Sequence, residues 1–578
     1  MENPEIARIL EEVADVLEIR NENPFRIRAY RNAVRTVEGL TTPLRKWVAE
    51  GRPLTDLQGI GKEMANHITE MVETGTLGFR DELLAEIPRS LIELMRLPNL
   101  GPKKAKKVYD ELKIGSVDEL EAAAKEGRIA AIPGFGAKSQ EKILAGIADY
   151  RLHGSRFLLP AAERFVEPLL GYLRETPELE RLEVAGSYRR RKETIGDVDL
   201  LAIASQPVPV MERFRSYPQV DKVLNAGDTK STVVLGSGLQ VDLRVVPADC
   251  YGAALVYFTG SKEHNVKLRR RAVEKGLRIS EYGVFREEPG GEGEWIAGRE
   301  EADVYATVGL PWVAPEMRED HGEIEAAAAG RLPHLITVGD LRGDLHMHST
   351  WSDGRNSIEE MVEACIARGY EYMVISDHSK ALAMTGGLDA YRLRLQWAEI
   401  EQVRARHPEI RILRSMEVDI LGDGSLDLED EMLAGLDLVL VSLHSRFDLP
   451  SSQQTERVLK ALEHPEVNVF CHPTARLINR RKPVEMDLDL ILRRAAELGV
   501  AVELNSSPNR LDLKDTHLKL ARELGCKIVI DTDAHHTREL ELIRYGVEQA
   551  RRAGLSATDV LNTLPFEAFR AAMERLPG

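Results

Sequence analysis

The sequence predicts a multidomain protein of mixed α+β and α/β class, with a helical N-terminal region, a mixed middle region and a C-terminal α/β barrel. Its 578 residues exceed what a single hydrophobic core usually organises, since domains average about 150 residues. A glycine-turn pattern repeats before residue 150, and apolar runs that end in histidine or acidic residues recur after residue 340. These observations indicate several modules joined in one chain.

Composition restricts the class of protein. The chain is 43% hydrophobic and 30% charged, which is typical of globular proteins, and no apolar run approaches the roughly 20 residues of a membrane span. The first residues lack the basic and apolar regions of a signal peptide, so we expect a cytoplasmic protein with no membrane partner. The four cysteines are widely spaced and form no CxxC pair, which predicts reduced core thiols.

The formal charge of −17 argues against a uniformly basic nucleic-acid binder, but the charge is unevenly distributed. Basic clusters occur at residues 26–35, 103–107, 189–192 and 267–271, all in the first half of the chain. Each cluster alone is as compatible with a solvated helix face as with a binding surface. Local basic surfaces therefore exist within an acidic protein.

The N-terminal region contains three copies of one turn-and-helix pattern, at residues 57–75, 97–108 and 132–143. Each copy has an apolar residue, a tight turn and then a new helix. The turns contain Gly59, Gly61, Gly101, Gly134 and Gly136, and Asn99 replaces the first glycine of the second copy. The pattern resembles the helix-hairpin-helix motif, which implies that backbone amides at helix starts bind DNA phosphates without reading the base sequence.

The middle region contains an acidic triad on predicted strands. Residues 181–203 read as strand, loop and strand, and the second strand carries Asp197 and Asp199 on one face. A following strand supplies Asp242. Three carboxylates in this arrangement predict a site for two divalent ions of the kind that catalyses nucleotidyl transfer, with Asp242 nearest the attacking hydroxyl.

The loop between the first two of these strands predicts a phosphate site. Gly186 and Ser187 offer backbone N–H groups and a hydroxyl, and Arg190 offers a counter-charge. With these motifs, roughly residues 1–320 resemble a family X DNA polymerase. The resemblance implies Mg²⁺ or Mn²⁺ at the triad, dNTP substrates bound by Ser187 and Arg190, and gapped or nicked double-stranded DNA as the partner.

Residues 257–285 resemble the nucleotide-selecting thumb of that family. The resemblance implies that Tyr257 and Phe258 lie beneath the incoming sugar, where Gly260 allows a close approach. It also implies that Asn265 contacts the minor-groove edge of the new base and that Arg269 contacts the template strand.

Two positions depart from the family pattern. His67 stands where lyase-active members have a lysine on the helix after the first hairpin, which argues against deoxyribose-phosphate lyase activity by that route, although Lys62 is near in sequence. Gln240 replaces a family arginine close to the third acid, and we expect it to tune Asp242 without abolishing metal binding.

The C-terminal region carries the most distinctive pattern. Histidines and carboxylates end successive apolar runs that read as strands, and in His-x-His and Asp-x-His pairs both side chains fall on one side of the sheet. Ligands at the ends of parallel strands converge on one face of an α/β barrel. The candidates are His346, His348, Asp353, His378, Glu417, His444, His472, Asp533 and His535. So many imidazoles and carboxylates predict a polynuclear site for Zn²⁺, Mn²⁺ or Fe.

From about residue 343 onward the chain resembles a polymerase and histidinol phosphatase (PHP) domain, whose fold is a distorted (β/α)7 barrel. The resemblance implies phosphoester hydrolysis with three divalent metals. One is held by His346, His348, Glu417 and Asp533, a second by Asp353, His378 and His535, and a third by His444, His472 and the bridging Glu417.

Other polar residues of this region have less specific interpretations. Arg446, Arg476, Arg480 and Arg481 follow the later ligands and are equally compatible with phosphate contacts and with a solvated basic loop. Asp419, Asp437 and Asp531 lie near ligand strands, and we expect them to be structural or to support the ligands.

The motifs divide the chain into six expected segments. These are a helical domain with the first hairpin (1–80), a fingers-like helical domain with the other two (81–152), a nucleotidyltransferase palm (153–249), a thumb (250–318), a linker (319–342) and the PHP domain (343–578).

The leading hypothesis is a monomeric bacterial DNA repair polymerase that acts in base excision repair at the nucleoid. It would fill short gaps, and its PHP half would remove 3′ nucleotides or 3′ phosphates. In one alternative, the PHP half acts mainly as an abasic-site endonuclease or a small-molecule phosphatase. In another, the chain is a non-catalytic scaffold that bridges DNA ends.

Overall fold

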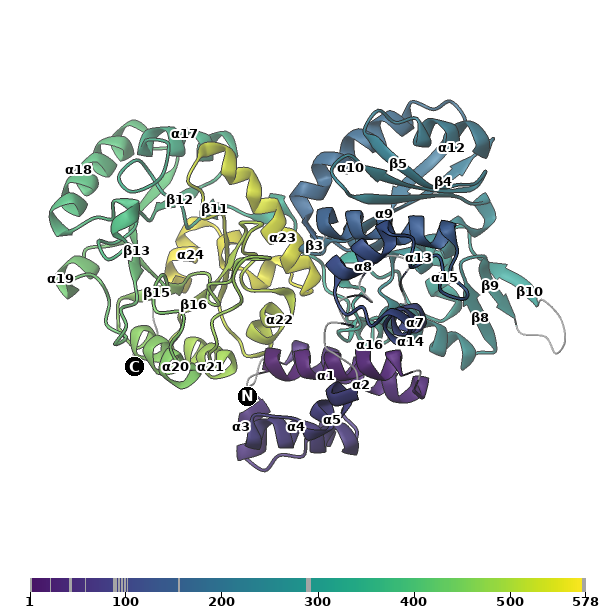
Figure 1. Cartoon of the computed structure of the whole chain (residues 1–578). Coiled ribbons are helices and arrows are strands. Elements are labelled where there is room, and N and C mark those ends of the chain that lie inside the picture. Colours follow the sequence, from purple (N-terminus) through teal and green to yellow (C-terminus); the bar gives the residue numbers. More distant parts are fainter. Residues whose placement is uncertain are drawn as a thin grey trace. The chain divides into compact units, whose positions relative to one another are not determined.

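The computed structural model describes residues 3–20, 22–40, 44–57, 59–86, 91, 94, 97, 100, 102–153, 156–286 and 293–573. The chain divides into two compact units, residues 1–154 and 155–578. Figure 1 shows the helices and strands of both units. Among the described residues, no helix combines the length and apolar character that crossing a membrane requires.

The described part of the first unit is helical. Its helices are α1 (Asn3–Ile19), α2 (Pro24–Gly39), α3 (Leu44–Ala49), α4 (Lys62–Thr74), α5 (Gly78–Glu86), α7 (Pro102–Leu112), α8 (Val117–Lys125) and α9 (Ala137–His153), with a 3-10 turn η1 (Leu54–Asp56). Buried side chains recur every three or four residues along α1, as at Leu10, Val13 and Leu17. This is the apolar stripe by which an amphipathic helix packs on its neighbours.

Helices of this unit begin after the predicted glycine turns. α4 begins directly after Gly61, and α9 begins directly after Gly136. Gly59 (φ +85°) and Gly134 (φ +83°) adopt the left-handed conformation that glycine enters without steric cost. The turns therefore redirect the chain immediately before each helix start.

The second unit begins with a five-stranded mixed sheet. Its strands are β2 (Leu179–Val184), β4 (Asp197–Ala204), β5 (Val220–Ala226), β6 (Lys230–Leu235) and β7 (Gln240–Val245), in the spatial order β2-β4-β7-β6-β5. The strand pair β1 (Phe157–Leu158) and β3 (Thr194–Ile195) and helices α10 (Leu159–Arg174), α11 (Gly186–Arg189) and α12 (Pro207–Arg215) accompany it. β4 and β7 pair in parallel, whereas the other neighbours in this sheet are antiparallel.

The region after the sheet combines helices with a three-stranded antiparallel sheet. It contains η2 (Ala248–Cys250), α13 (Tyr251–Thr259), α14 (Lys262–Val273), β8 (Leu277–Ser280), β9 (Gly283–Arg286), β10 (Glu294–Ala297) and α15 (Glu301–Thr307). The segment predicted as a linker is packed and contains α16 (Glu323–Ala328) and η4 (Val338–Asp340), preceded by η3 (Pro315–Met317). In it, buried Glu323 lies 2.6 Å from Nδ1 of His264 on α14.

The C-terminal part is a nearly closed parallel barrel. Its strands are β11 (Gly343–Asp344), β12 (Tyr372–Ile375), β13 (Arg411–Asp419), β14 (Leu438–Ser442), β15 (Val467–Phe470), β16 (Ala501–Asn505) and β17 (Ile528–Asp531), arranged in sequence order with parallel pairings. Helices surround these strands (Figure 1). Because both faces are covered, the strands read as continuous apolar runs in the sequence.

The helices of the barrel mostly follow its strands. They are α17 (Ile358–Ala367), α18 (Ala390–Arg406), α19 (Asp430–Leu433), α20 (Ser451–Leu462), α21 (Leu488–Leu498), α22 (Asp515–Glu523), α23 (Ile543–Arg552) and α24 (Phe566–Met573). Short 3-10 turns are η5 (Ala383–Thr385), η6 (Thr537–Leu542), η7 (Ala557–Asp559) and η8 (Leu561–Thr563).

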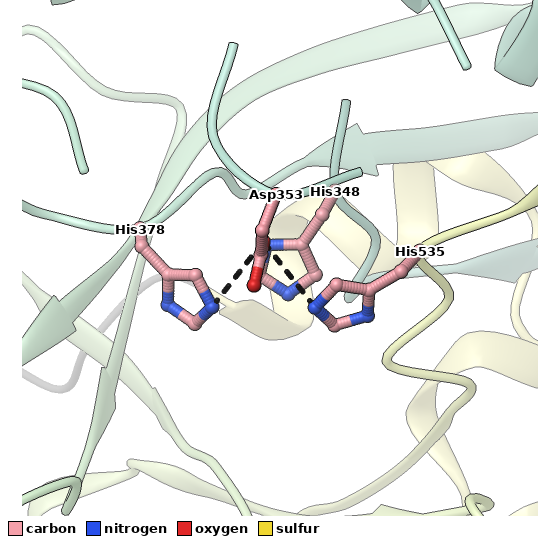
Figure 2. A group of neighbouring side chains, drawn as sticks. All are labelled: His348, Asp353, His378 and His535. Atoms are coloured by element: carbon pink, nitrogen blue, oxygen red, sulfur yellow. Dashed lines mark ion pairs between the residues drawn. The ribbon is translucent and has the colours of Figure 1, made fainter. Parts of the chain in front are cut away.

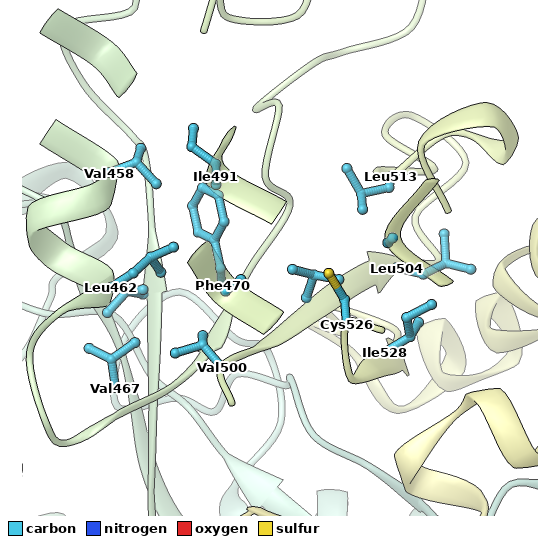
Figure 3. Packing of buried hydrophobic residues seen from close by; sticks show 14 of the residues in the cluster. Val458, Leu462, Val467, Phe470, Ile491, Val500, Leu504, Leu513, Cys526 and Ile528 are labelled. Carbon is cyan, nitrogen blue, oxygen red and sulfur yellow. The ribbon is translucent and has the colours of Figure 1, made fainter. Parts of the chain in front are cut away.

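Residues far apart in the sequence pack helices onto the barrel and close it. Figure 3 shows buried side chains such as Phe470 and Ile528 packed in one cluster, which also contains residues of the surrounding helices. Where the first and last strands do not pair in the sheet, Asn562 Nδ2 donates to the backbone oxygens of Gly343 (2.9 Å) and Ile530 (2.7 Å). A side chain thus satisfies backbone groups that would otherwise be buried without partners.

Candidate active sites

The acidic triad lies on the parallel strand pair β4 and β7. Asp197 and Asp199 are two residues apart on β4, and Asp199 stands directly opposite Asp242 of β7. Val198 and Val241 are buried on the other side of these strands. Because side chains alternate along a strand, the three carboxylates share one face. The structure thus brings together the three acids that the sequence suggested.

Neighbouring groups place the three acids in different environments. Asp242 accepts hydrogen bonds from Thr232 Oγ1 (2.6 Å) and Gln240 Nε2 (2.9 Å). Gln240 therefore orients the third acid directly. Burial and the nearby charges of Asp197 and Asp242 raise the pKa of Asp199 to about 6. Divalent cations bind such clustered carboxylates because they compensate the mutual repulsion.

A cavity of about 630 Å³ opens beside the triad. It is lined by Asp197 and Asp199 and by the predicted nucleotide- and template-contacting residues Gly186, Ser187, Arg190, Tyr257, Phe258, Gly260, Asn265 and Arg269. Arg156, Lys192 and Lys262 also line it and were not predicted individually, although Lys192 belongs to a basic cluster noted in the sequence. The combination of carboxylates and cations suits a metal-bound polyphosphate.

Two glycines allow close approach between groups of this cavity. A Cβ atom on Gly186 (φ +63°) would lie 2.9 Å from Asp199 Oδ2. A Cβ atom on Gly260 (φ +69°) would lie 3.1 Å from Arg190 Nη1. A larger residue at either position would therefore adopt a strained backbone and displace a group of the site.

Internal hydrogen bonds hold side chains that were predicted to contact the nucleotide or the template strand. Arg190 Nε donates to Glu319 Oε1 at 2.9 Å. Asn265 Nδ2 donates to the backbone oxygen of Tyr257 (2.7 Å), and Arg269 Nε donates to that of Asn265 (3.2 Å). The cavity wall is therefore ordered by contacts within the protein.

In the first unit, the structure places the hairpin glycines and the position of the family lysine. Gly59, Gly61, Gly134 and Gly136 lie at helix starts, whereas Asn99 and Gly101 lie outside the described residues. His67, Tyr30 and Phe79 form a triangular cluster of rings, with centroids 5.5–6.4 Å apart. Lys62 is exposed at the start of α4. Thus the imidazole at the position predicted to match the family lysine packs against two aromatic rings.

The nine predicted metal ligands converge at the carboxyl ends of the barrel strands. Figure 2 shows His348, Asp353, His378 and His535 grouped together, with Asp353 Oδ1 3.7 Å from His378 Nε2 and 3.4 Å from His535 Nε2. Among the described residues, three further groups have ligand atoms within 4.8 Å of one another. They are His346, His348 and Asp533; His378, Glu417 and His444; and His346, Cys471 and Glu503. His346, His348 and His378 each belong to two groups.

Alternation along the chain places the paired ligands on one side, as predicted. Met347 and Ala534 form a parallel β-bridge beyond the ends of β11 and β17. Both residues are fully buried in a hydrophobic cluster. The ligands that flank them, including His346 and Asp533, therefore face the opposite side, where the metal-ligand groups lie.

Glu417 lies between these groups. Its Oε2 atom is 2.8 Å from His378 Nδ1 and 3.4 Å from His346 Nε2. Its Oε1 atom is 2.8 Å from His472 Nε2 and 3.3 Å from His444 Nε2. Two oxygens of one carboxylate thus face different imidazole pairs, which suits a ligand that bridges metals.

Buried polar atoms at this centre fit metal coordination. Within the described part of the chain, His346 Nε2, His348 Nδ1 and Glu417 Oε2 are buried and make no hydrogen bond. An unsatisfied buried group costs about 1–3 kcal/mol, which coordination would remove. Burial and the charges of His535 and His378 lower the pKa of His348 to about 3, so this imidazole is neutral, the form that binds metals. The donor set suits Zn²⁺, Mn²⁺ or Fe.

Sequence reasoning missed Glu503 and Arg510. Glu503 Oε1 lies 2.6 Å from His346 Nδ1, and its other oxygen accepts a hydrogen bond from the backbone N–H of His472. Such a carboxylate fixes the orientation of a ligating imidazole. The only clue to Glu503 in the sequence was that a single acidic residue interrupts the apolar run of strand β16. Arg510 Nε lies 3.5 Å from Asp533 Oδ2, which places a cation beside the ligands.

The four arginines near the later ligands have different environments. Arg476 is neither a phosphate contact nor part of a solvated loop, because it is buried and its Nη2 lies 2.5 Å from Glu193 Oε1. Arg481 lies over the ring of Phe447, 4.2 Å from its centroid. Arg446 and Arg480 are exposed. The interpretation of Arg476 was wrong because its partner lies far away in the sequence.

The three additional acids support the backbone or lie elsewhere. Asp419 accepts a hydrogen bond from the backbone N–H of His444 (3.2 Å), and Asp531 accepts one from that of Leu345 (2.9 Å). Both therefore hold segments that carry ligands. Asp437 instead pairs with Arg404 at 2.7 Å.

Family models match separate parts of the chain. A helix-hairpin-helix domain matches residues 1–77, and a SAM-like helix-hairpin-helix tandem matches residues 51–113 and 91–149. A DNA polymerase beta thumb matches residues 254–319, and a PHP domain matches residues 344–507.

Similar proteins cover the whole chain or part of it. The Bacillus subtilis protein named DNA polymerase/3′-5′ exonuclease PolX is 38% identical over 577 residues, with 100% of both chains covered. Proteins named probable phosphatases from Syntrophotalea carbinolica and Thermoanaerobacter sp. are each 28% identical over 38% of this chain and cover 90% and 89% of their own lengths. Because the first similarity extends over the full length and accompanies the thumb, hairpin and PHP matches, the chain belongs to the bacterial family X DNA polymerases that carry a C-terminal PHP domain.

Proposed function

We propose that this protein fills short gaps in DNA and trims 3′ ends, with Asp197, Asp199 and Asp242 as the catalytic acids of nucleotidyl transfer. The observation that carries the polymerase proposal is the position of the acidic triad beside a cavity lined by Ser187 and Arg190. Full-length similarity to a protein named DNA polymerase/3′-5′ exonuclease supports both activities.

In the polymerase site, this chain's residues would bind and orient the substrates. Mg²⁺ or Mn²⁺ at the triad would supply charge compensation for the attacking and leaving oxygens. Ser187 and Arg190 would hold the triphosphate of a dNTP, and Tyr257 and Phe258 would limit the space beneath its sugar. Asn265 would contact the new base.

The helical region would hold the DNA. Gly59, Gly61, Gly134 and Gly136 lie at helix starts, where backbone amides can bind phosphates without reading sequence. Arg269 would contact the template strand from the cavity wall. A monomer bound in this way to gapped or nicked duplex would act at the bacterial nucleoid.

The PHP site would hydrolyse the 3′-terminal phosphodiester bond. Up to three Zn²⁺, Mn²⁺ or Fe ions held by the nine ligands would supply Lewis acidity there. Glu503 would keep His346 in its ligating orientation, and Arg510 would offer a cation to the substrate phosphate.

A time course on a gapped, 5′-phosphorylated duplex, with and without dNTPs, tests both assignments. We expect Asp242→Ala to abolish extension while the primer still shortens, and His346→Ala to abolish shortening while extension continues. Asp221→Ala, at an exposed acid of β5 in the same sheet, should behave like the parent. Extension that survives Asp242→Ala would contradict the polymerase assignment.

A second candidate for the PHP half is a small-molecule phosphatase, favoured by the 28% identity to proteins named probable phosphatases. The parent and His346→Ala should be compared on single-stranded DNA, abasic-site duplex, 3′-phosphorylated ends and small phosphate esters. The exonuclease proposal expects the variant to lose hydrolysis of unmodified DNA ends. If its loss is confined to small esters, the phosphatase assignment replaces it.

A further inference from the structure

Helix α23 of the PHP domain contacts the palm loop that carries Arg190. This loop, residues 190–193, lies between α11 and β3 and is called the triphosphate loop below. Arg552 Nη1 donates to the backbone oxygen of Arg190 at 2.6 Å. Glu548 lies 2.7 Å from Arg191 Nη2, so a second residue of the same helix face meets the loop one position further on.

The far end of the triphosphate loop is held by the same domain. Gln549 Nε2 donates to Glu193 Oε1 at 2.8 Å, and Arg476 Nη2 lies 2.5 Å from the same oxygen. Arg476 is buried, and its charge pairs with Glu193. Side chains and backbone of the loop are therefore fixed at three of its positions by residues of the PHP domain.

Arg552 has a geometry that another cation does not reproduce. Its Nη1 atom reaches Glu319 Oε1 (3.1 Å) as well as the Arg190 backbone, while its Nη2 atom donates to Asp515 Oδ2 (2.5 Å). The side chain is 3% exposed. A planar guanidinium serves these separate acceptors at once, whereas a lysine ammonium acts as a point charge.

Arg552 and Arg190 share one carboxylate oxygen. Arg190 Nε donates to Glu319 Oε1 at 2.9 Å, the same atom that Arg552 approaches. Burial opposes ionisation of Glu319, but the charges of Arg552, Arg190 and Lys192 hold its pKa at about 2. Glu319 is therefore a carboxylate at neutral pH. If Arg190 turned towards a triphosphate, Arg552 and Lys192 would still neutralise Glu319, and no buried charge would be left alone.

We propose that Arg552 is a positioning residue for nucleotide binding by the polymerase. It holds the backbone of the triphosphate loop at Arg190 and keeps Glu319 paired when Arg190 binds the triphosphate. This inference rests on the proposed role of Arg190 in the polymerase reaction. Helix α23 of the hydrolytic domain thereby contributes to the affinity of the polymerase for dNTP without touching the nucleotide.

The test is a dNTP titration of single-nucleotide gap filling by the full-length protein. In Arg552→Lys, we expect the KM for dNTP to rise roughly tenfold, as for loss of a charge-assisted hydrogen bond, with a smaller change in kcat. Hydrolysis of single-stranded DNA without dNTP should match the parent, which reports a folded barrel because Ile543 and Val547 of α23 pack in its core. A general loss of structure would lower both activities.

The neighbouring arginine of α23 provides a matched control. Arg551 pairs with Glu316 at 2.9 Å and donates to the backbone oxygen of Ile336, and neither partner belongs to the triphosphate loop. Arg551→Lys should leave the KM for dNTP unchanged. An equal rise of KM in both variants would overturn the proposal, because the effect would then come from the helix and not from Arg552.

Variants of Arg190 separate failure of this inference from failure of the proposed function. Arg190→Ala should raise the KM for dNTP, and adding Arg552→Lys to it should add little, since one residue acts through the other. If Arg190→Ala leaves KM unchanged, both the proposed role of Arg190 and this inference fail. The inference alone fails in two cases. In the first, Arg190→Ala raises the KM for dNTP but Arg552→Lys does not. In the second, the KM of the double variant rises by the product of the two single effects.

A double variant covers the case in which Arg552→Lys loses both activities. Combining Arg552→Gln with Asp515→Asn removes both partners of a buried ion pair and leaves no unpaired charge between them. With hydrolysis retained, a raised KM for dNTP supports the proposal, and an unchanged KM overturns it.

Discussion

The polymerase site and the PHP site arrange their candidate metal ligands in opposite ways. The first has three carboxylates on a strand pair beside an open cavity, and Asp197 is exposed. The second draws nine candidate ligands from the carboxyl ends of the barrel strands and the segments that follow them, and His346, His348 and Glu417 are at most 1% exposed. We infer that ions at the first site arrive with the nucleotide, whereas ions at the second are part of the folded domain.

Removal of the bridging carboxylate should have the largest effect on this comparison. Glu417→Gln takes one ionised ligand from between four imidazoles, so we expect hydrolysis of single-stranded DNA to fall by about a thousandfold or more. Bound metal, measured by elemental analysis, should fall with it, while gap filling continues. Glu429→Gln, at an exposed acid, is the control. If Glu417→Gln kept its full metal content, Glu417 would not be needed to hold the metals of the PHP site, and this part of the comparison would be wrong.

Metal removal should distinguish the two sites by how they recover. After dialysis against a chelator, added Mg²⁺ should restore gap filling at once, whereas hydrolysis should return only with Zn²⁺, Mn²⁺ or Fe. Because resident metals bind the folded state, we expect their loss to lower the free energy of unfolding of the PHP domain by about 3–4 kcal/mol. Calorimetry of the full chain measures this. An unchanged transition would mean that the second site is not metal-loaded as isolated.

The carboxylate behind His346 should have an intermediate effect. Glu503→Gln removes the charge that orients this imidazole, so the apparent affinity of the hydrolytic site for Mn²⁺ should fall about 10- to 100-fold. A Mn²⁺ titration of hydrolysis after chelation measures the change, with Glu456→Gln on the exposed side of α20 as the control. Saturating Mn²⁺ should restore most of the rate. A rate that stays low at saturation would instead indicate a damaged barrel.

Proton competition at the acidic triad should have the smallest effect. The pKa of Asp199 is raised to about 6 by burial and by the charges of Asp197 and Asp242. Above that pH Asp199 is ionised, and as the pH falls through 6 it takes up a proton that an entering ion must displace. The Mg²⁺ concentration for half-maximal gap filling should therefore rise by up to about tenfold per pH unit below 6. A requirement that is flat between pH 7.5 and 5.5 would contradict this pKa.

The sequence predicted the fold class and the candidate ligands because both depend on local periodicity. Alternation alone placed His346 and Asp533 on the side opposite Met347 and Ala534, and continuous apolar runs marked the buried strands. The fold class is confirmed by the family matches, whereas the domain boundaries and the roles of the site residues stay predictions.

Contacts between distant segments were beyond sequence reasoning. Arg476 looked like a loop residue near the ligands, but its partner Glu193 lies between α11 and β3, far from it in the sequence. Glu503 had no motif around it, and its role appears only when β16 lies beside the segment of His346. The sequence around Arg552 likewise does not indicate its partners, which include Arg190 and Glu319. Partner choice for a charged side chain depends on which surfaces the fold brings together, and this information is not local.

The hydrogen bonds of Asn562 affect the order in which a newly made chain gains its activities. A ribosome releases the palm, with Asp242, long before it releases Asn562, whose side chain joins the two ends of the barrel. Asp533 and His535 also leave the ribosome after Asp242, and the Met347–Ala534 β-bridge that joins their segment to that of His346 can form only then. A growing chain can therefore complete its acidic triad before its metal centre closes.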